Sequence, residues 1–239
     1  NISMKKIIVT GGEGRFSSLL KKVKTSHSLI FPKKNELDIT NYSMIKKYFR
    51  KNKAKMVMHL AGLSRPMMLH ETDIQLSIKL NIIGTANIVR ACADENIKLI
   101  YFSTSYVYPG IKGNYKEIDP VLPTMNYAWS KLGGECAVSM YKNSLILRIC
   151  MTEKPFSHKK ALYDAKTSFI YQEDVAAIIM KLINKKGVIN IGGKAQRIFD
   201  FAKKDNPNVK KNYLKKVKNL KFPRNSTINI SKLNKILSK

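Results

Sequence analysis

Three side chains have the types that proton transfer to a carbonyl oxygen requires: Thr104, Tyr127 and Lys131. Tyr127 and Lys131 stand four residues apart, so a helix would place a phenol and an ammonium on one face. A free tyrosine has a pKa of about 10, too high for efficient transfer near neutral pH, and a neighbouring lysine is expected to lower it. A threonine hydroxyl can hold and polarise the oxygen that gains charge when hydride reaches the carbonyl carbon. The set predicts carbonyl reduction with a nicotinamide cofactor.

The spacing of Tyr127 and Lys131 alone is weak evidence, because such pairs occur often by chance. In the alternative interpretation, Tyr127 belongs to the core and Lys131 is a solvated side chain. The predicted elements favour the catalytic interpretation. Thr104 follows a predicted strand, 99–103, and the Tyr–Lys pair lies where a predicted helix, 128–141, begins. Because ligands bind at the carboxyl edge of an open α/β sheet, these positions are expected to converge.

The chain alternates short apolar segments with segments of helical periodicity, which is the pattern of an α/β protein. Predicted strands cover residues 5–9, 28–31, 56–59, 99–103, 144–149 and 188–191. Predicted helices cover residues 16–24, 44–50, 74–93, 128–141 and 172–184. Short strands separated by helices predict a Rossmann-type, doubly wound parallel sheet with helices on both faces.

The same pattern predicts how the chain divides. Residues 1–3, before Met4, have the character of a cloning remnant. Residues 4–150 are expected to form an NAD(P)-binding Rossmann domain, and residues 151–239 a reduced C-terminal substrate lobe. A helix and a strand within 171–191 are expected to return from this second part.

A glycine-rich turn follows the first predicted strand, where residues 10–17 read TGGEGRFS. Such a turn lets the backbone approach a pyrophosphate at the start of a helix, which predicts dinucleotide binding. The alternative is a purely structural turn. Ser17 stands where a third glycine is usual, and we expect it to loosen the packing of helix on strand slightly. The cofactor-binding residues predicted here are Gly11, Gly12, Gly14, Arg15 and Phe16.

The ends of the second and third predicted strands add further cofactor contacts. No acid follows the second strand, whereas Lys33 and Lys34 are suited to a 2′-phosphate, so NADPH is favoured over NADH. The alternative is two solvated lysines. Asp38 and Ile39 stand where they can contact adenine. The third strand runs into small residues that let the cofactor lie against the backbone, with simple close packing as the alternative: Leu60, Ala61 and Gly62.

Composition limits the classes of function. The formal charge of +28 raises the alternative of nucleic-acid binding. The lysines are spread along the chain without a DNA-binding spacing, so we expect no nucleic-acid partner, although a positive field speeds the encounter with anionic nucleotides. Three scattered cysteines and four histidines show neither a disulfide framework nor metal-ligand spacing. No apolar run reaches the roughly 18 residues of a membrane span, and a cytoplasmic protein without a membrane partner is expected.

Several motifs together resemble the extended short-chain dehydrogenase/reductases. The glycine turn, the Tyr127–Lys131 pair and LNIIGTANIV around Asn81 all match that group, and YQEDVAAII (171–179) is common in it. Within the group the chain is most similar to the dTDP-4-dehydrorhamnose reductases. The segments that carry this similarity are YFSTSYVYPG (101–110), EIDPVLPTMNYAWSKLGGE (117–135) and FPRNSTINISKLNKIL (222–237).

The resemblance implies reduction of a nucleotide-linked 4-keto-6-deoxy sugar by NADPH or NADH. In this scheme Tyr127 is the acid, Lys131 contacts the nicotinamide ribose and Thr104 contacts the 4-keto oxygen. Asn81 and Ser103 would contact the cofactor. Residues implied to contact the substrate are Ser105, Tyr106 and Arg224.

The resemblance leaves alternatives open. Dehydratases of the group carry Asp-Glu where this chain has Ser105-Tyr106, which disfavours dehydration. The stretch from Met151 to Phe169 is much shorter than usual, so the substrate lobe must be small. An epimerase, a reductase of another keto sugar, or a non-catalytic dinucleotide-binding subunit are the alternatives. By analogy with the family, we expect a homodimer through the predicted helices near 74–93 and 128–141.

Overall fold

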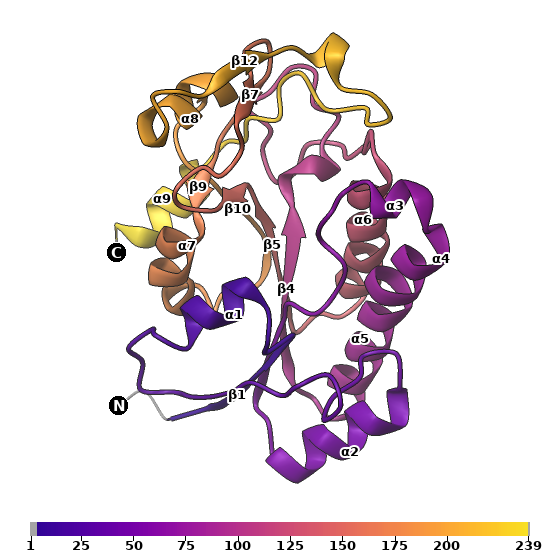
Figure 1. Ribbon diagram of the computed structural model, residues 1–239. Coiled ribbons are helices and arrows are strands. Elements are labelled where there is room, and N and C mark those ends of the chain that lie inside the picture. Colours follow the sequence, from indigo (N-terminus) through magenta and orange to yellow (C-terminus); the bar gives the residue numbers. More distant parts are fainter. Residues whose placement is uncertain (1–3, 239) are drawn as a thin grey trace.

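The computed structural model describes residues 4–238, and residues 1–3, interpreted above as a cloning remnant, lie outside the described part. A central sheet is flanked by helices on both faces, and a smaller set of strands and one helix lies at one end of it (Figure 1).

The central sheet has six strands, all parallel, in the order β10-β5-β4-β3-β1-β2. This confirms the predicted doubly wound α/β fold. The order places β2 on one side of β1 and β3 on the other, so the chain reverses its direction of travel across the sheet at β1. The strands are β1 (Lys6–Thr10), β2 (Ser28–Ile30), β3 (Met56–His59), β4 (Lys98–Thr104), β5 (Ser144–Ile149) and β10 (Gly187–Ile191).

Side chains alternate between the two faces of the sheet, as the pleat requires. In β1, Ile7 and Val9 enter one apolar core and Ile8 enters the other. The first core is covered by α1 (Arg15–Leu20), α7 (Gln172–Ile178) and α9 (Ser231–Leu237). The second is covered by α2 (Tyr42–Asn52), α5 (Gly84–Asp94) and α6 (Asn126–Ser139). Figure 1 shows the two groups of helices on opposite sides of the strands.

Two helices are shorter than predicted. The helix predicted over 16–24 ends at Leu20, because the backbone N–H groups of Lys22 and Val23 bond three residues back and tighten the last turn. The helix predicted over 172–184 likewise gives way to a 3₁₀ turn at Ile179–Lys181.

The helix predicted over 74–93 is continuous in direction but not uniform. It consists of α4 (Ile74–Ser77), a π-helical stretch (Ile78–Ile83) and α5, and is preceded by the short α3 (Leu69–Thr72). Periodicity of apolar residues does not distinguish a π turn from an α turn, so this irregularity was not predicted. π turns occur often at functional sites, and this one carries Asn81.

The smaller part lies beyond the carboxyl ends of the central strands and has its own apolar core, which includes Phe156, Ile198, Phe199 and Phe201. It contains three two-stranded pairs, β11 with β8, β12 with β7 and β6 with β9. The chain enters it after β5, returns through α7 and β10 to the central sheet, and enters it again. Its elements are β6 (Met151–Thr152), β7 (Lys160–Leu162), β8 (Lys166–Thr167), β9 (Ile170–Tyr171), β11 (Gln196–Arg197), α8 (Ile198–Asp205) and β12 (Lys210–Asn212).

Within residues 4–238, no helix has both the length and the apolar character needed to cross a membrane.

Candidate active site

The carboxyl ends of β1 and β3 meet where the strand order reverses, and this is the position at which open α/β sheets bind ligands. The glycine turn follows β1, and Leu60–Gly62 follow β3. The two loops touch: Gly11 has φ of +71°, and a Cβ there would lie 3.0 Å from the backbone nitrogen of Ala61. A side chain at residue 11 would therefore separate the loops and strain the turn.

The other turn residues have different roles. A Cβ at Gly12 would lie 2.7 Å from the Phe31 carbonyl carbon, so this glycine packs against the end of β2 and does not line the cavity described below. Ser17 was expected to loosen the packing of helix on strand, and that expectation is wrong. The Ser17 side chain is buried, and its hydroxyl donates to the Gly11 carbonyl oxygen at 2.8 Å, which ties the helix to the turn.

A buried network beneath the two loops was not predicted from the sequence. The Thr10 hydroxyl oxygen accepts from the backbone N–H groups of Leu60 and Ala61 at 3.1 and 3.0 Å. Its own proton is then directed to Nδ1 of His59 at 2.8 Å, so Nε2 carries the ring proton and donates to the Thr85 hydroxyl at 3.0 Å. Burial lowers the pKa of His59 to about 3, which keeps the ring neutral in this chain of bonds.

A cavity of about 540 Å³ begins at the carboxyl ends of β1 and β3 and extends along the glycine turn. Its size is within the range of small-molecule sites. Residues 11 and 14, which line it, are glycines, so no side chain covers the backbone of the turn there. The residues present therefore fit a dinucleotide whose pyrophosphate lies against the main chain. The predicted cofactor residues that line it are Gly11, Gly14, Arg15, Phe16, Asp38, Ile39, Leu60, Ala61, Gly62 and Ser103, together with Tyr127 and Lys131.

The far end of this cavity is suited to an adenosine group. The Asp38 carboxylate accepts from the backbone N–H and the hydroxyl of Thr40, both at 2.8 Å, and the backbone bond holds the pKa of Asp38 below its usual value. Lys34 lines the cavity, whereas Lys33 lines an adjoining hollow that it shares with Lys34 and Asp38. The two lysines thus lie near Asp38 at the same end of the cavity.

A second cavity of about 750 Å³ adjoins the first and is covered by the smaller part of the protein. Thr104 lines only this second cavity, and Lys131 only the first. Tyr127 lines both. Apolar side chains from the smaller part form much of the remaining wall: Phe156, Leu162, Phe169, Ile198 and Phe222.

Tyr127 and Lys131 are partly buried on α6, and both side chains are shifted from their ordinary ionisation. Burial raises the pKa of the Tyr127 phenol, although a hydrogen bond with Thr104 opposes the shift. The expected lowering of this pKa is therefore wrong for the protein without ligands, because burial outweighs the neighbouring charges. Burial also lowers the pKa of Lys131 to about 8, with Glu135 acting in the opposite direction. The Lys131 ammonium lies 4.4 Å from the centre of the Tyr101 ring.

This ionisation of Lys131 predicts a pH dependence. Because its pKa in the folded protein is about 8, the ammonium is present below that pH and is lost as the pH rises through it. A proton transfer at this site that depends on the ammonium should therefore slow on the alkaline side, with kcat/KM declining through about pH 8. A Lys131→Arg variant keeps its charge and should lack this decline in whatever activity remains. A flat wild-type profile from pH 7 to 9 would contradict the assignment.

A buried ion pair joins Glu135 of α6 to Arg148 of β5, and it supports the end of β4 as well. Glu135, one turn after Lys131 on α6, accepts from Nε of Arg148 at 3.0 Å and from the Ser103 hydroxyl at 2.7 Å. Nη1 of Arg148 donates to the Tyr108 hydroxyl at 2.9 Å. Ser103 precedes Thr104 in β4, so the pair fixes the end of β4 against the helix that carries Tyr127. Ser103, which was predicted to contact the cofactor, lines the first cavity, but its hydroxyl donates to Glu135.

Asn81 does not line either cavity. Its side-chain amide accepts from the Leu63 N–H at 2.7 Å and donates to the Leu63 carbonyl oxygen at 2.8 Å and to the Ser130 hydroxyl at 2.8 Å. It thus joins the loop after β3 to α6, and in the free protein it positions the site without facing the cavity.

The three predicted substrate residues separate into two groups. Ser105 and Tyr106 follow β4, are buried and line the second cavity, where the Tyr106 ring meets Phe222 edge-on. Arg224 does not line that cavity. It lines a different one, because residues 224–226 run along β8, where the Arg224 carbonyl oxygen accepts from the Lys166 N–H and Asn225 bridges to Lys166.

Two charged residues of the site were missed. Glu153, which follows β6, forms ion pairs with Arg15 of the glycine turn and with Arg65, the latter at 2.8 Å. All three side chains line both cavities. Burial raises the pKa of Glu153, but the two guanidinium groups outweigh it and hold the pKa below its usual value. The available signal was the position of Glu153 four residues after the central strand β5, since the carboxyl ends of strands converge in this fold.

Comparison with known proteins agrees with this geometry. The chain is 25% identical over 202 residues to a dTDP-4-dehydrorhamnose reductase of Aggregatibacter actinomycetemcomitans, covering 76% of this chain and 68% of that protein. It is 26% identical over 170 residues to methionine adenosyltransferase 2 subunit beta of Xenopus laevis, covering 63% of this chain and 51% of that protein.

A solved structure of dTDP-4-dehydrorhamnose reductase from Bacillus anthracis in complex with NADP superimposes with a TM-score of 0.85 at 22% identity, covering 98% of this chain and 92% of the other. At this identity the likeness concerns the fold. Residues 4–153, which are 150 of the 239 residues, match the RmlD substrate binding domain. The protein belongs to the RmlD substrate binding domain family.

Proposed function

We propose that this protein is an NAD(P)H-dependent reductase of a nucleotide-linked 4-keto-6-deoxy sugar. The observation that carries the proposal is the position of Tyr127, which lies on the wall shared by the two cavities. A proton donor at that wall contacts both the space suited to a dinucleotide and the space suited to a keto substrate.

The residues around the wall have complementary tasks in such a reduction. A bound nicotinamide dinucleotide would supply the hydride. Tyr127, protonated at neutral pH, donates a proton to the carbonyl oxygen, and because burial raises the pKa of the free phenol, neighbouring positive charge must stabilise the phenolate that forms. Thr104, beside Tyr127, holds that oxygen in place. Lys131 faces the dinucleotide cavity, where its ammonium is suited to the hydroxyls of a ribose and favours the phenolate that remains after transfer.

The substrate class is supported by family membership and by the name of the Aggregatibacter relative. The second cavity is large enough for part of a nucleotide sugar. Its phenylalanine-rich wall offers surfaces for a base or for the methyl group of a deoxy sugar. Ser105 and Tyr106 at the end of β4 provide no carboxylates beside the triad, which disfavours dehydration.

NADPH is proposed as the preferred cofactor. Lys34 lines the first cavity, Lys33 lines the hollow that adjoins it, and the Bacillus neighbour is described in complex with NADP. The acid that accepts ribose hydroxyls in many NAD sites is absent directly after β2 (Ser28–Ile30), where residues 32–35 read PKKN.

The proposal is tested by following cofactor oxidation with a dTDP-4-keto-6-deoxy sugar, with NADPH and NADH supplied separately. Turnover with both cofactors and a higher kcat/KM for NADPH is the expected result. Equal or better use of NADH would contradict the cofactor preference. An absence of turnover with either cofactor, under conditions in which both bind, would contradict the reductase assignment.

A second candidate is a dinucleotide-binding subunit without catalysis of its own. The similarity to a methionine adenosyltransferase subunit favours it, since that protein is described as a subunit of an enzyme with a different reaction. The same assay separates the two candidates, because a subunit of this kind would bind the dinucleotide and leave the keto sugar unchanged.

We propose that the protein forms a homodimer through the surface of α4, the π turn and α6. Large apolar side chains are exposed there: Ile74 (53%), Ile78 (37%), Ile83 (49%) and Trp129 (47%). Covering such a surface by an identical one is the usual arrangement of a two-fold dimer. Solution scattering should therefore give twice the mass of 27.2 kDa, and a monomeric mass would contradict the interface.

The proposal includes action in the cytoplasm, supported by three free cysteines, two of them buried. We propose further that the charge of +28 speeds the encounter with anionic substrates and does not serve nucleic-acid binding.

A further inference from the structure

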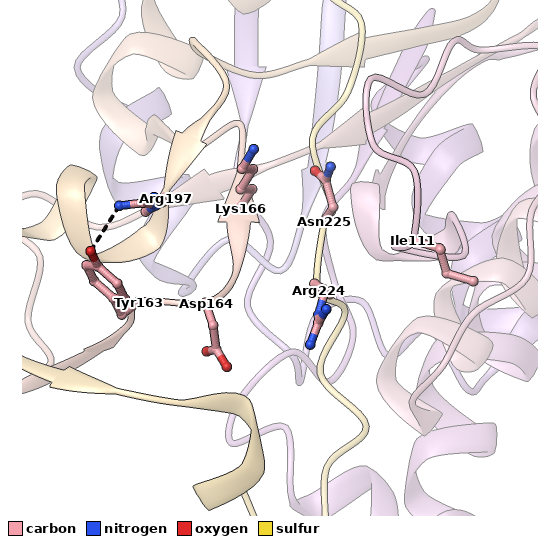
Figure 2. A pocket seen from close by; sticks show the side chains of 7 residues that line it. All are labelled: Ile111, Tyr163, Asp164, Lys166, Arg197, Arg224 and Asn225. Atoms are coloured by element: carbon pink, nitrogen blue, oxygen red, sulfur yellow. Dashed lines mark hydrogen bonds between the residues drawn. The ribbon is translucent and has the colours of Figure 1, made fainter.

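A third cavity, of about 450 Å³, lies in the smaller part of the protein and shares no lining residue with the two cavities of the active site. Three cations line it together with one carboxylate. Figure 2 shows the seven lining side chains: Ile111, Tyr163, Asp164, Lys166, Arg197, Arg224 and Asn225.

The backbone fixes the positions of these cations. In the antiparallel pair of β8 and β11, Lys166 is directly opposite Arg197. On its other side Lys166 forms a parallel bridge with Asn225, and its N–H donates to the Arg224 carbonyl oxygen at 2.9 Å. Figure 2 shows Lys166 between Arg197 and Asn225. Three neighbouring segments therefore hold the cations together, whatever the conformations of their side chains.

This arrangement has an electrostatic cost. Like charges directly opposite one another in a sheet are destabilising. Within residues 4–238, no ion pair includes Lys166, Arg197 or Arg224. The lining carboxylate of Asp164 is held by the Leu214 N–H at 2.9 Å. The charge of the cavity lining is therefore positive, three cations against one anion, and an anion bound between the cations would offset their repulsion.

The other lining residues indicate what else the ligand carries. The Tyr163 hydroxyl accepts from Arg197 at 3.2 Å, and the guanidinium lies 4.8 Å from the centre of the Tyr163 ring. The aromatic ring thus supports the guanidinium in the cavity wall, and Ile111 adds an apolar surface. The volume accommodates more than a single inorganic ion.

We propose that this cavity binds the diphosphate group of a small organic ligand, at a site separate from the catalytic one. Two guanidinium groups and an ammonium suit the several oxygens of a diphosphate, since arginine pairs with phosphate through two parallel hydrogen bonds and lysine acts as a point charge. Tyr163 and Ile111 contact the organic part.

The test is calorimetric titration with inorganic pyrophosphate, at about 0.15 M salt so that the general field of the protein is screened. Saturating NADPH occupies the dinucleotide cavity during the titration. Three proteins are compared: the wild type, the Lys166→Gln/Arg224→Gln variant and the Lys47→Gln/Lys51→Gln variant. The last removes the same charge from exposed positions on α2, outside every cavity described above.

The proposal predicts saturable binding to the wild type and to the α2 variant, and at least about tenfold weaker binding to the cavity variant. The side chains of Lys166 and Arg224 are exposed, and in the unliganded state the cavity variant should unfold at the same temperature as the wild type or higher, because repulsion is removed. Equal weakening in both variants would show a general effect of charge and overturn the proposal. Absence of saturable binding to the wild type would also overturn it.

Discussion

Replacing Tyr127 by Phe should lower the rate of keto-sugar reduction by about 10² to 10⁴-fold, the range that a positioned proton donor contributes. The phenol lies on the wall between the two cavities, and Thr104 lines the second cavity with it. Removing one hydroxyl leaves the ring in place, so cofactor binding should be unchanged. The measurement is kcat for the keto sugar together with the Kd of NADPH.

Tyr141→Phe is the matched control. Tyr141 follows the same helix, and its hydroxyl donates to the backbone carbonyls of Cys92 and Ile97, away from both cavities. This variant should keep wild-type kcat. If Tyr127→Phe turned over at the rate of the control, Tyr127 would not be the proton donor, and the interpretation of it as a core tyrosine would stand.

Replacing Arg148 by Met should destabilise the protein by about 3–5 kcal/mol, since it leaves the buried Glu135 carboxylate without its partner. Both side chains of the pair are nearly inaccessible, at 8% and 4% exposed. The free energy of unfolding in urea at 25 °C measures the effect. Because that loss is a large fraction of the stability of an ordinary domain, low yield of folded protein is also expected.

Two further variants make the prediction specific. Glu135→Leu combined with Arg148→Met removes both charges and should lose less stability than Arg148→Met alone. Arg50→Met removes an exposed pair with Glu95, which has the side-chain exposures 62% and 22%, and should cost less than about 1 kcal/mol. A double variant less stable than Arg148→Met would contradict the view that an unpartnered buried carboxylate causes the loss.

The sequence was sufficient to predict the fold, because all six central strands and the helices between them carry strong patterns. Each strand is a short apolar run, and the glycine turn after β1 marks where the sheet reverses its strand order. Elements were less well predicted where local bonding decides their ends. Leu20 ends α1 through tighter backbone bonds, and the π turn around Asn81 has no signature in apolar periodicity.

The site was predicted where a residue type has a chemical reason, and missed where a residue acts through others. Thr104, Tyr127 and Lys131 could be chosen by chemistry and by their places relative to strands. The partnerships of His59 with Thr10 and of Glu135 with Arg148 join residues 49 and 13 positions apart, and no local pattern indicates them.

The predicted position that differs most from the structure is that of Arg224. Its neighbourhood in the sequence suggested substrate contact, but pairing with β8 directs it to a separate cavity.

The fate of hydride during a single turnover distinguishes a reductase from the alternatives. NADPH labelled with deuterium at the transferable position of the nicotinamide is mixed with excess enzyme and a dTDP-4-keto-6-deoxy sugar, and the product is analysed by mass spectrometry and NMR. One deuterium at C4 of the reduced sugar, absent with Tyr127→Phe on the same timescale, is the predicted result. A sugar that is unchanged, or altered in configuration without deuterium, while NADPH binds, would contradict the reductase assignment.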